Sequence, residues 1–199
     1  MLHELGHAHY YLAYDNASLF SLYKSRPNSA IHEAVGEAVI LLQDGCQASQ
    51  KPKEDSPKSL INRLLSEAVT SFVRLPYALS LERWRHELMT GKGSLSAKEM
   101  NSRYWEIRDE VSRVKSPEND RDEDENFPAV DALSKYHVAF FMPYLRYFYG
   151  TLMMHQIQAT LCREELQGSV LANCCPKAEA MERFRYQDFM SFSSFSKKL

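Results

Sequence analysis

The sequence opens with Met1-Leu2-His3-Glu4-Leu5-Gly6-His7, and the His-Glu-x-x-His pattern within it constrains the chain more than any other feature. On a helix, this pattern places two imidazoles one turn apart on the same face, where both can bind one zinc ion. Glu4 is then available as a general base toward water on the metal. Because the pattern is short, a zinc site also requires a third ligand and a substrate site elsewhere in the chain.

Composition is typical of a globular protein and excludes several classes of partner. The 199 residues are enough for one domain with a core, and a hydrophobic content of 44% argues against disorder. Lys+Arg 24 against Asp+Glu 26 gives a net charge of -2, so no bulk attraction to nucleic acid or to an anionic membrane is expected. No run of residues approaches the roughly 18 apolar positions that a membrane span needs. The first residues also lack the basic and then apolar regions of a signal peptide.

The spacing of apolar residues and turn formers predicts a mostly α-helical chain. Helices are expected over residues 1–14, 30–42, 59–89, 95–114 and 177–190, with a long aromatic-rich helical segment over 130–166. Between them we expect a loop at 26–29 that can cap the next helix, a polar loop over 43–58, a turn at 91–93 and an acidic loop over 115–128.

Two of these helices carry more specific expectations. The helix over 59–89 should be interrupted at Pro76, because proline removes a backbone donor inside a helix. Its apolar stripe is formed by Leu60, Leu64, Val69, Phe72 and Val73. The buried side of the helix over 95–114 is formed by Tyr104, Trp105, Ile107, Val111 and Val114.

The segment His32-Glu33-Ala34-Val35-Gly36-Glu37 offers the third zinc ligand. Zinc sites with two histidines and one glutamate take their carboxylate from a second helix, and Glu33 lies far enough after His7 for the chain to reverse. Glu37, one turn further on, is placed to bind a ligand imidazole from the side away from the metal. The alternative is that Glu33 and Glu37 are ordinary carboxylates on a helix surface.

Four separated blocks of the sequence resemble the angiotensin-converting enzyme family, the peptidyl-dipeptidase A metallopeptidases. HELGHAHYYLAY is followed by HEAVGE, by RWRHELMTG at residues 83–91 and by SKYHVAFFMPYLRYF at residues 134–148. The blocks occur in the family's order and span most of the chain. The resemblance implies a mainly α fragment, the zinc-binding half of a two-lobed, deep-cleft domain. Its parts would be zinc-binding helices over 1–42, a linker loop over 43–58, a helical core over 59–114, an acidic loop over 115–128, and substrate-site and C-terminal helices over 129–199.

The resemblance also implies a role for individual residues. His3, His7 and Glu33 would bind zinc, Glu4 would be the general base, and Glu37 would support a ligand from the second shell. Lys135 and Tyr144 match the residues that hold the carboxylate of the substrate, whereas His137 and Tyr147 match those that bind the peptide and stabilise the oxyanion. Arg146 matches an arginine that helps bind chloride, and Cys162 and Cys174 match a disulfide.

Several of these residues have a simpler interpretation. Tyr144, Tyr147 and Phe148 have helical spacing and could be core residues. Lys135 could be a solvated lysine and His137 a surface histidine. His9, His86 and His155 lack matching partners and are interpreted as structural.

The chain also departs from the family pattern. Two extra residues separate the first two metal-binding blocks, and Glu87 occupies a position where chloride-dependent members place an arginine. Because Lys135 and Tyr144 are both kept, the resemblance favours release of dipeptides over release of single residues. With only four cysteines, one bridge is possible; Cys175 could compete with Cys174 for Cys162, and Cys46 has no evident partner.

Two hypotheses follow. The chain is either a zinc-dependent peptidyl-dipeptidase segment acting on oligopeptides, with chloride as a candidate activator, or a truncated and inactive family member that acts through interactions. The N-terminal half of the family's domain is an expected partner. The Cys162–Cys174 bridge and the Asn16-Ala17-Ser18 glycosylation sequon favour an extracellular location, and a lost N-terminus would explain why no signal peptide is present.

Overall fold

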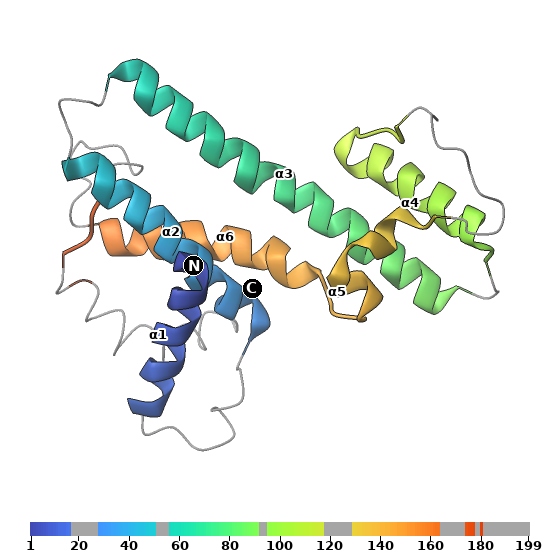
Figure 1. The fold of residues 1–199 in the computed structure, drawn as a ribbon, viewed down its shortest axis with the longest axis horizontal. Helices are drawn as coiled ribbons and strands as arrows, with labels where there is room; N and C mark the ends of the chain where they lie inside the picture. Colours follow the sequence, from blue (N-terminus) through green and yellow to red (C-terminus); the bar gives the residue numbers. More distant parts are fainter. Residues whose placement is uncertain are drawn as a thin grey trace. The chain divides into compact units, whose positions relative to one another are not determined.

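The computed structural model describes residues 1–16, 28–50, 56–91, 95–117, 129–163, 174–177 and 180. These residues form α-helices and one short 3-10 helix, and they contain no strand, as expected for a mainly α chain. The elements are α1 (Leu2–Asn16), α2 (Ser29–Gln50), α3 (Pro57–Thr90), α4 (Ala97–Ser112), η2 (Asp131–Ser134), α5 (Tyr136–Ala139) and α6 (Leu145–Cys162) (Figure 1).

The chain divides into two compact units. The first contains Met1–Ser66 and Tyr149–Leu199, and the second contains Glu67–Phe148. The core of the first unit joins α2 to α6 and is formed by Ala34, Ala38, Leu42, Met154, Ile157, Leu161, Cys162 and Cys174. The core of the second unit joins α3, α4 and the segment before α6, and is formed by Ala78, Leu81, Trp84, Tyr104, Ile107, Ala132, Val138 and Tyr144.

Helix α2 begins as the sequence predicts but ends later. The Asn28 side chain accepts a hydrogen bond from the Ala30 N–H at 2.8 Å, which confirms the expected cap. The predicted loop over 43–58 is wrong for residues 43–50, because α2 continues to Gln50. Gly45 and Ala48 continue its buried face, and both are too small to give a clear hydrophobic signal. Helix α3 then begins at Pro57, where a missing N–H costs nothing.

Helix α3 is not interrupted at Pro76, contrary to the prediction. The Ser80 hydroxyl donates to the Pro76 carbonyl at 2.7 Å, in the turn that follows the proline. The predicted apolar stripe is largely exposed; Val69, Phe72 and Val73 are all more than half exposed. The buried residues of α3 are Ser71, Ala78, Ser80, Leu81 and Trp84.

Helix α4 ends two residues before the predicted limit. Ser96 and Glu99 form a capping box at its start, and Arg113 ends it in the left-handed region with φ 55°. Tyr104 and Ile107 are buried as predicted. Val114 lies beyond the helix and is exposed, so its predicted burial is wrong.

The predicted long helix over 130–166 is broken into η2, α5 and α6. Phe141 has a positive φ of 55°, which a helix does not allow, and Pro143 cannot supply an N–H. The chain therefore turns between α5 and α6. This turn brings the residues after η2 back toward the start of α6.

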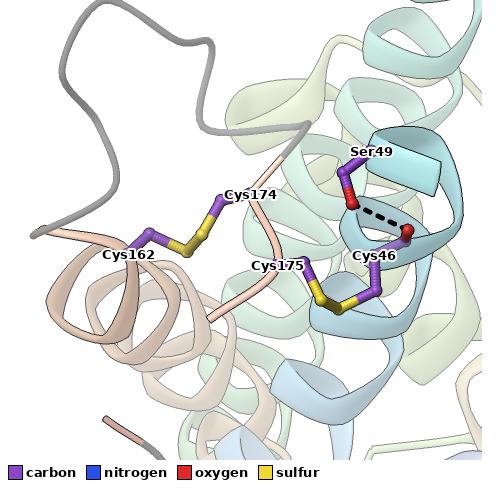
Figure 2. Close-up of a disulfide and its surroundings, with 5 residues drawn as sticks. All are labelled: Cys46, Ser49, Cys162, Cys174 and Cys175. Atoms are coloured by element: carbon purple, nitrogen blue, oxygen red, sulfur yellow. Dashed lines mark hydrogen bonds between the residues drawn. A yellow bond between two sulfur atoms is a disulfide. The ribbon is translucent and has the colours of Figure 1, made fainter. Parts of the chain in front are cut away.

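Two disulfides join the helices of the first unit to the short segment at 174–177. The Cys162–Cys174 bridge implied by the family resemblance is present. Cys46, for which no partner was evident, is bonded to Cys175. Figure 2 shows that the adjacent cysteines connect the C-terminal part of α2 with the end of α6. The Ser49 hydroxyl donates to the Cys46 carbonyl at 2.9 Å in the last turn of α2.

Some predictions fall outside the described residues. These are most of the acidic loop, the turn after Gly91, the final helix over 177–190 apart from two of its residues, and the last two positions of the Asn16-Ala17-Ser18 sequon. In the described part of the chain, no helix combines the length and apolar character that crossing a membrane requires.

Candidate functional site

Helices α1 and α2 bring together the three residues predicted to bind zinc. His3 and His7 lie one turn apart on α1, and Glu33 lies in the second turn of α2. The Nε2 atoms of the two histidines are 2.9 Å apart, and His3 Nε2 lies 3.5 Å from Glu33 Oε2. One ligand atom from each residue falls within 4.8 Å of the other two. All three side chains are partly buried.

These separations fit a zinc ion. Nitrogen and oxygen ligands lie about 2.0–2.1 Å from zinc, so two ligands at the tetrahedral angle are about 3.3 Å apart. The separations of 2.9 and 3.5 Å lie close to that value, and two imidazoles with one carboxylate are a donor set typical of catalytic zinc sites. The residues that are present therefore suit zinc and leave a position for a water or a substrate.

Glycines allow the two helices to approach closely enough to form this group. A Cβ added to Gly6 on α1 would lie 2.9 Å from the Gly36 Cα on α2. A Cβ added to Gly36 would lie 2.8 Å from His3 Cε1 and 2.9 Å from His7 Cε1. The ligand rings thus rest directly on the backbone of α2 at Gly36. On the other side of α2, a Cβ added to Gly150 on α6 would lie 3.3 Å from the Glu33 Cβ.

The two ligand imidazoles have different neighbours on α2. His3 Nδ1 lies 3.6 Å from Glu37 Oε1, whereas His3 Nε2 faces His7 and Glu33. The His7 ring is stacked on the His32 ring, with centroids 3.9 Å apart and an interplanar angle of 6°. Burial lowers the pKa of His7, and the neighbouring His3 lowers it further, against the opposing charges of Glu33 and Glu4. Both lowering effects favour the neutral imidazole that binds a metal.

Glu4 lies on α1 directly after His3 and is exposed. Its charge raises the pKa of His7, against the larger lowering effect of burial. An exposed carboxylate at the edge of a metal centre can exchange protons with solvent.

The second unit contains the four residues that the resemblance assigns to the substrate. The Tyr147 hydroxyl lies 2.8 Å from His137 Nε2, and the tautomer of His137 decides which of the two donates. The Lys135 Nζ lies 5.4 Å from the centre of the Tyr144 ring, a cation–π distance. The Tyr144 and Tyr147 rings are 4.6 Å apart. These four side chains therefore form one cluster around the turn between α5 and α6.

The electrostatics of this cluster are set by burial and by two cations. Burial lowers the pKa of His137, and the positive charges of Lys135 and Arg146 lower it further. His137 is thus favoured in its neutral form. Arg146 donates from Nε to the Pro143 carbonyl at 3.0 Å, so it also supports the turn before α6.

Glu82 on α3 holds the start of α6. Its Oε2 accepts a hydrogen bond from the Tyr144 N–H at 2.8 Å, and its other oxygen pairs with Arg85. Burial alone would raise the pKa of Glu82, but the hydrogen bonds from Arg85 and Tyr144 outweigh burial and lower it. A carboxylate at the N-terminal end of α6 also interacts favourably with the helix dipole.

Glu87, which occupies the position of a chloride-binding arginine in the family, takes part in an ion-pair network. Two of its contacts are with Arg103, at 2.7 and 3.1 Å, and a third is with Arg83 at 3.1 Å. The hydrogen bond from Arg103 is the main reason why the pKa of Glu87 is lowered. A carboxylate thus neutralises these two arginines within the second unit.

A family model described as angiotensin-converting enzyme matches residues 1–196 of the chain. The chain belongs to the angiotensin-converting enzyme family. It is 30% identical over 168 residues to an angiotensin-converting enzyme-related protein of Drosophila melanogaster, covering 81% of this chain and 25% of that protein. It is 29% identical over 165 residues to an angiotensin-converting enzyme of Haematobia irritans exigua, covering 80% and 26%.

A third relative gives the same result. The angiotensin-converting enzyme of Theromyzon tessulatum is 28% identical over 177 residues, which cover 86% of this chain and 27% of that enzyme. The chain thus spans about a quarter of the length of these members of the angiotensin-converting enzyme family. Family membership implies zinc, and His3, His7 and Glu33 form a group that could hold a metal ion.

Sequence reasoning missed three residues that shape the two clusters: Gly36, His32 and Glu82. Gly36 and His32 stand inside the HEAVGE block, so their nearness to Glu33 was available as a signal. Glu82 directly precedes the RWRHELMTG block, and nothing in its spacing indicates a contact with Tyr144, which follows it by 62 positions. Each of the three acts through a contact between elements.

Proposed function

We propose that this chain supplies the zinc-binding part of a peptidase site that releases dipeptides from the C-terminal end of oligopeptides. The observation that carries the proposal is the group formed by His3, His7 and Glu33. Membership of the angiotensin-converting enzyme family supports a metallopeptidase reaction for such a group. The finer assignment to dipeptide release rests on Lys135 and Tyr144, the residues that the resemblance connects with the substrate carboxylate.

In this proposal His3, His7 and Glu33 hold the metal, and Glu37 orients His3. Zinc bound there supplies a Lewis acid and a water of lowered pKa. Glu4 would take up the proton of the attacking water and pass it to the leaving amine. The exposed position of Glu4 and its influence on His7 are compatible with this role.

The resemblance assigns the substrate to four residues that form a cluster within the second unit. His137 and Tyr147 share a hydrogen bond, so only the Tyr147 O–H remains free to donate when His137 Nε2 carries the proton of that bond. In that tautomer the Tyr147 hydroxyl would donate to the oxygen that gains charge as the peptide bond is attacked. The Lys135 ammonium and the Tyr144 hydroxyl would hold the substrate carboxylate, a charge-assisted arrangement. We assign these roles from the family resemblance together with the contacts inside the cluster.

The setting proposed for this reaction is extracellular. The two disulfides require an oxidising compartment, and family membership points the same way. Arg146 is the proposed chloride contact. Since Glu87 already neutralises Arg83 and Arg103, the proposal does not extend a chloride site to these two arginines.

The second candidate function is that of a zinc-binding chain without turnover that acts through interactions. It is favoured by the exposed apolar side chains of α3, where Val69 is 65%, Phe72 67% and Val73 58% exposed. Such side chains on a helix surface are typical of a face that contacts another polypeptide. The two candidates share the metal group and differ in whether Glu4 supports catalysis.

Zinc stoichiometry and hydrolysis of a blocked tripeptide separate the candidates. We expect one zinc per chain, and turnover that Glu4→Gln abolishes without loss of metal. Glu106→Gln, on the exposed side of α4, is the matched control. Metal binding through His3, His7 and Glu33 with no turnover dependent on Glu4 would favour the second candidate. If zinc binding persists in His3→Ala and Glu33→Ala, the metal group itself is wrong.

A further inference from the structure

His32 places an aromatic ring against a ligand of the candidate metal centre without being a ligand itself. Its imidazole is parallel to that of His7, with centroids 3.9 Å apart. Among the described residues, the group whose ligand atoms converge contains His3, His7 and Glu33, and His32 is not a member. A ring stacked face to face on His7 presents its π surface to that ligand.

Two tyrosine rings of α1 also lie close to the His32 ring. The Tyr11 ring centroid lies 5.2 Å from that of His32, and the Tyr10 centroid lies 5.6 Å away, both at tilted angles. Tyr10 is buried, with 3% of its surface exposed. His32 therefore fits between His7 on one turn of α1 and two tyrosines on the next. The close Gly6–Gly36 approach of the two helices allows this insertion.

We propose that His32 is a positioning residue for zinc, whose stacked ring fixes the orientation of the His7 imidazole. The inference rests on the proposed metal group and adds a residue to it. His3 has a carboxylate beside its second nitrogen, whereas His7 has a flat ring against its face. One turn of α2 thus supplies both a ligand, Glu33, and the group that orients a ligand of the other helix.

The physical reason is the narrow tolerance of a metal site. A ligand imidazole can rotate about two side-chain bonds, and zinc binding requires its nitrogen to stay within a fraction of an ångström of one position. Aromatic pairs in contact contribute beyond the area they bury, and a parallel stack opposes tilting of the ring. Groups that orient metal ligands typically change metal affinity by 10- to 100-fold when they are removed.

The test compares zinc affinity of the full chain and its variants by competition with a chromogenic chelator. We expect His32→Ala to weaken zinc binding about tenfold, at the lower end of the range for such groups. His32→Phe keeps a flat ring and should restore affinity to within about twofold of the original. His9→Ala, an exposed histidine of α1, is the control and should leave affinity unchanged. The visible absorption of the Co²⁺ form should change in His32→Ala and return in His32→Phe.

The outcomes separate this inference from the proposed function. If His7→Ala binds zinc as tightly as the original chain, or if the original chain binds none, the metal group is wrong and the role of His32 falls with it. If His7→Ala weakens binding but His32→Ala leaves both affinity and the Co²⁺ spectrum unchanged, only the role of His32 is wrong. Weak binding by both His32→Phe and His32→Ala would also overturn it, because stacking would then not be the cause.

Folding of the variants is monitored by circular dichroism of the metal-free chains. Where His32→Ala does not fold, His32→Gln replaces it, since glutamine has similar length and polarity but no ring. Tight binding by His32→Phe with weak binding by His32→Gln supports the stack. Equal affinity of these two variants contradicts it.

Discussion

His3 and His7 occupy equivalent positions in the His-Glu-x-x-His pattern, yet α2 surrounds them with different chemistry. A carboxylate lies beside His3, and an imidazole is stacked on His7. The neighbours of a histidine decide its protonation and orientation, and both matter to a metal. Neighbouring residues also decide the protonation of His137 in the second unit, where burial and two cations favour the neutral ring.

At this scale, the lowered pKa of His137 predicts a dependence of stability on pH. The ordinary pKa of a histidine is 6.5, and the pKa of His137 in the folded chain is lower. At a pH below 6.5 the unfolded chain therefore binds the proton more readily than the folded chain. Stability is therefore lost as pH falls from 6.5 toward the lowered value. We expect the urea concentration at the unfolding midpoint to be lower at pH 5.5 than at pH 7.5. The difference should be smaller in His137→Gln. Exposed His86→Gln is the control, and an equal fall in His137→Gln would contradict the prediction.

The sequence predicted the residues of both clusters better than it predicted their supports. The residues assigned to zinc lie together, and so do the four assigned to the substrate. These residues belong to blocks that can be compared with a family. His32, Gly36 and Glu82 act on residues from other elements, and such contacts depend on how helices pack.

Among the elements, the crossing of α1 and α2 determines whether the metal group can form. At this crossing the two helices meet at Gly6 and Gly36, where neither carries a side chain. A Cβ added at either residue would lie 2.8–2.9 Å from atoms of the ligand rings or of the other backbone. The positions of the ligands therefore depend more on how α1 and α2 pack at this crossing than on the helix propensity of either segment.

Gly36→Ala tests the importance of this crossing. Replacing a glycine inside a helix by alanine usually stabilises it by about 1 kcal/mol. Here the new Cβ would lie 2.8–2.9 Å from ring atoms of His3 and His7, so the rings must move. We expect zinc affinity to fall by about 100-fold, comparable to the loss of an orienting group. Asp44→Ala, on the exposed side of α2, should leave it unchanged; unaltered affinity in Gly36→Ala would show that the crossing can relax.

The errors in the predicted elements have separate physical causes. The buried face of α2 continues through Gly45 and Ala48, whose small side chains give little periodic signal within a polar stretch. Helix α3 tolerates Pro76, because one missing donor does not outweigh the packing of Ala78, Leu81 and Trp84 in the core that follows. The apolar residues over 130–166 suggest one helix, but Phe141 adopts a left-handed conformation before Pro143. Packing outweighs local propensity in α2 and α3, whereas the break before α6 has a local cause in the backbone of Phe141 and Pro143.

On the scale of the whole molecule, two disulfides add covalent constraints to the packing of α2 and α6. The Cys46–Cys175 bridge spans 129 positions of the sequence, and the Cys162–Cys174 bridge spans 12. A bridge removes more freedom from the unfolded chain when its loop is longer. In that chain-entropy account the long loop contributes about 5 kcal/mol and the short loop about 3 kcal/mol.

Pairwise removal of the cysteines checks this order. We expect Cys46→Ala with Cys175→Ala to lower the free energy of unfolding more than Cys162→Ala with Cys174→Ala. Urea denaturation of both double variants measures the difference. The reverse order would mean that lost packing around Cys162, which is fully buried, outweighs loop length.

The adjacency of Cys174 and Cys175 has a consequence for fragments of the molecule. No protease can separate the two bridges without cutting the single peptide bond between them. A digest will therefore release one product in which three peptides are held together, one from α2, one from the end of α6 and one that carries both neighbours. The mass of that product is the same whichever neighbour is paired with Cys46. Stepwise reduction with alkylation of each freed thiol would distinguish the pairing in the structure from its isomer.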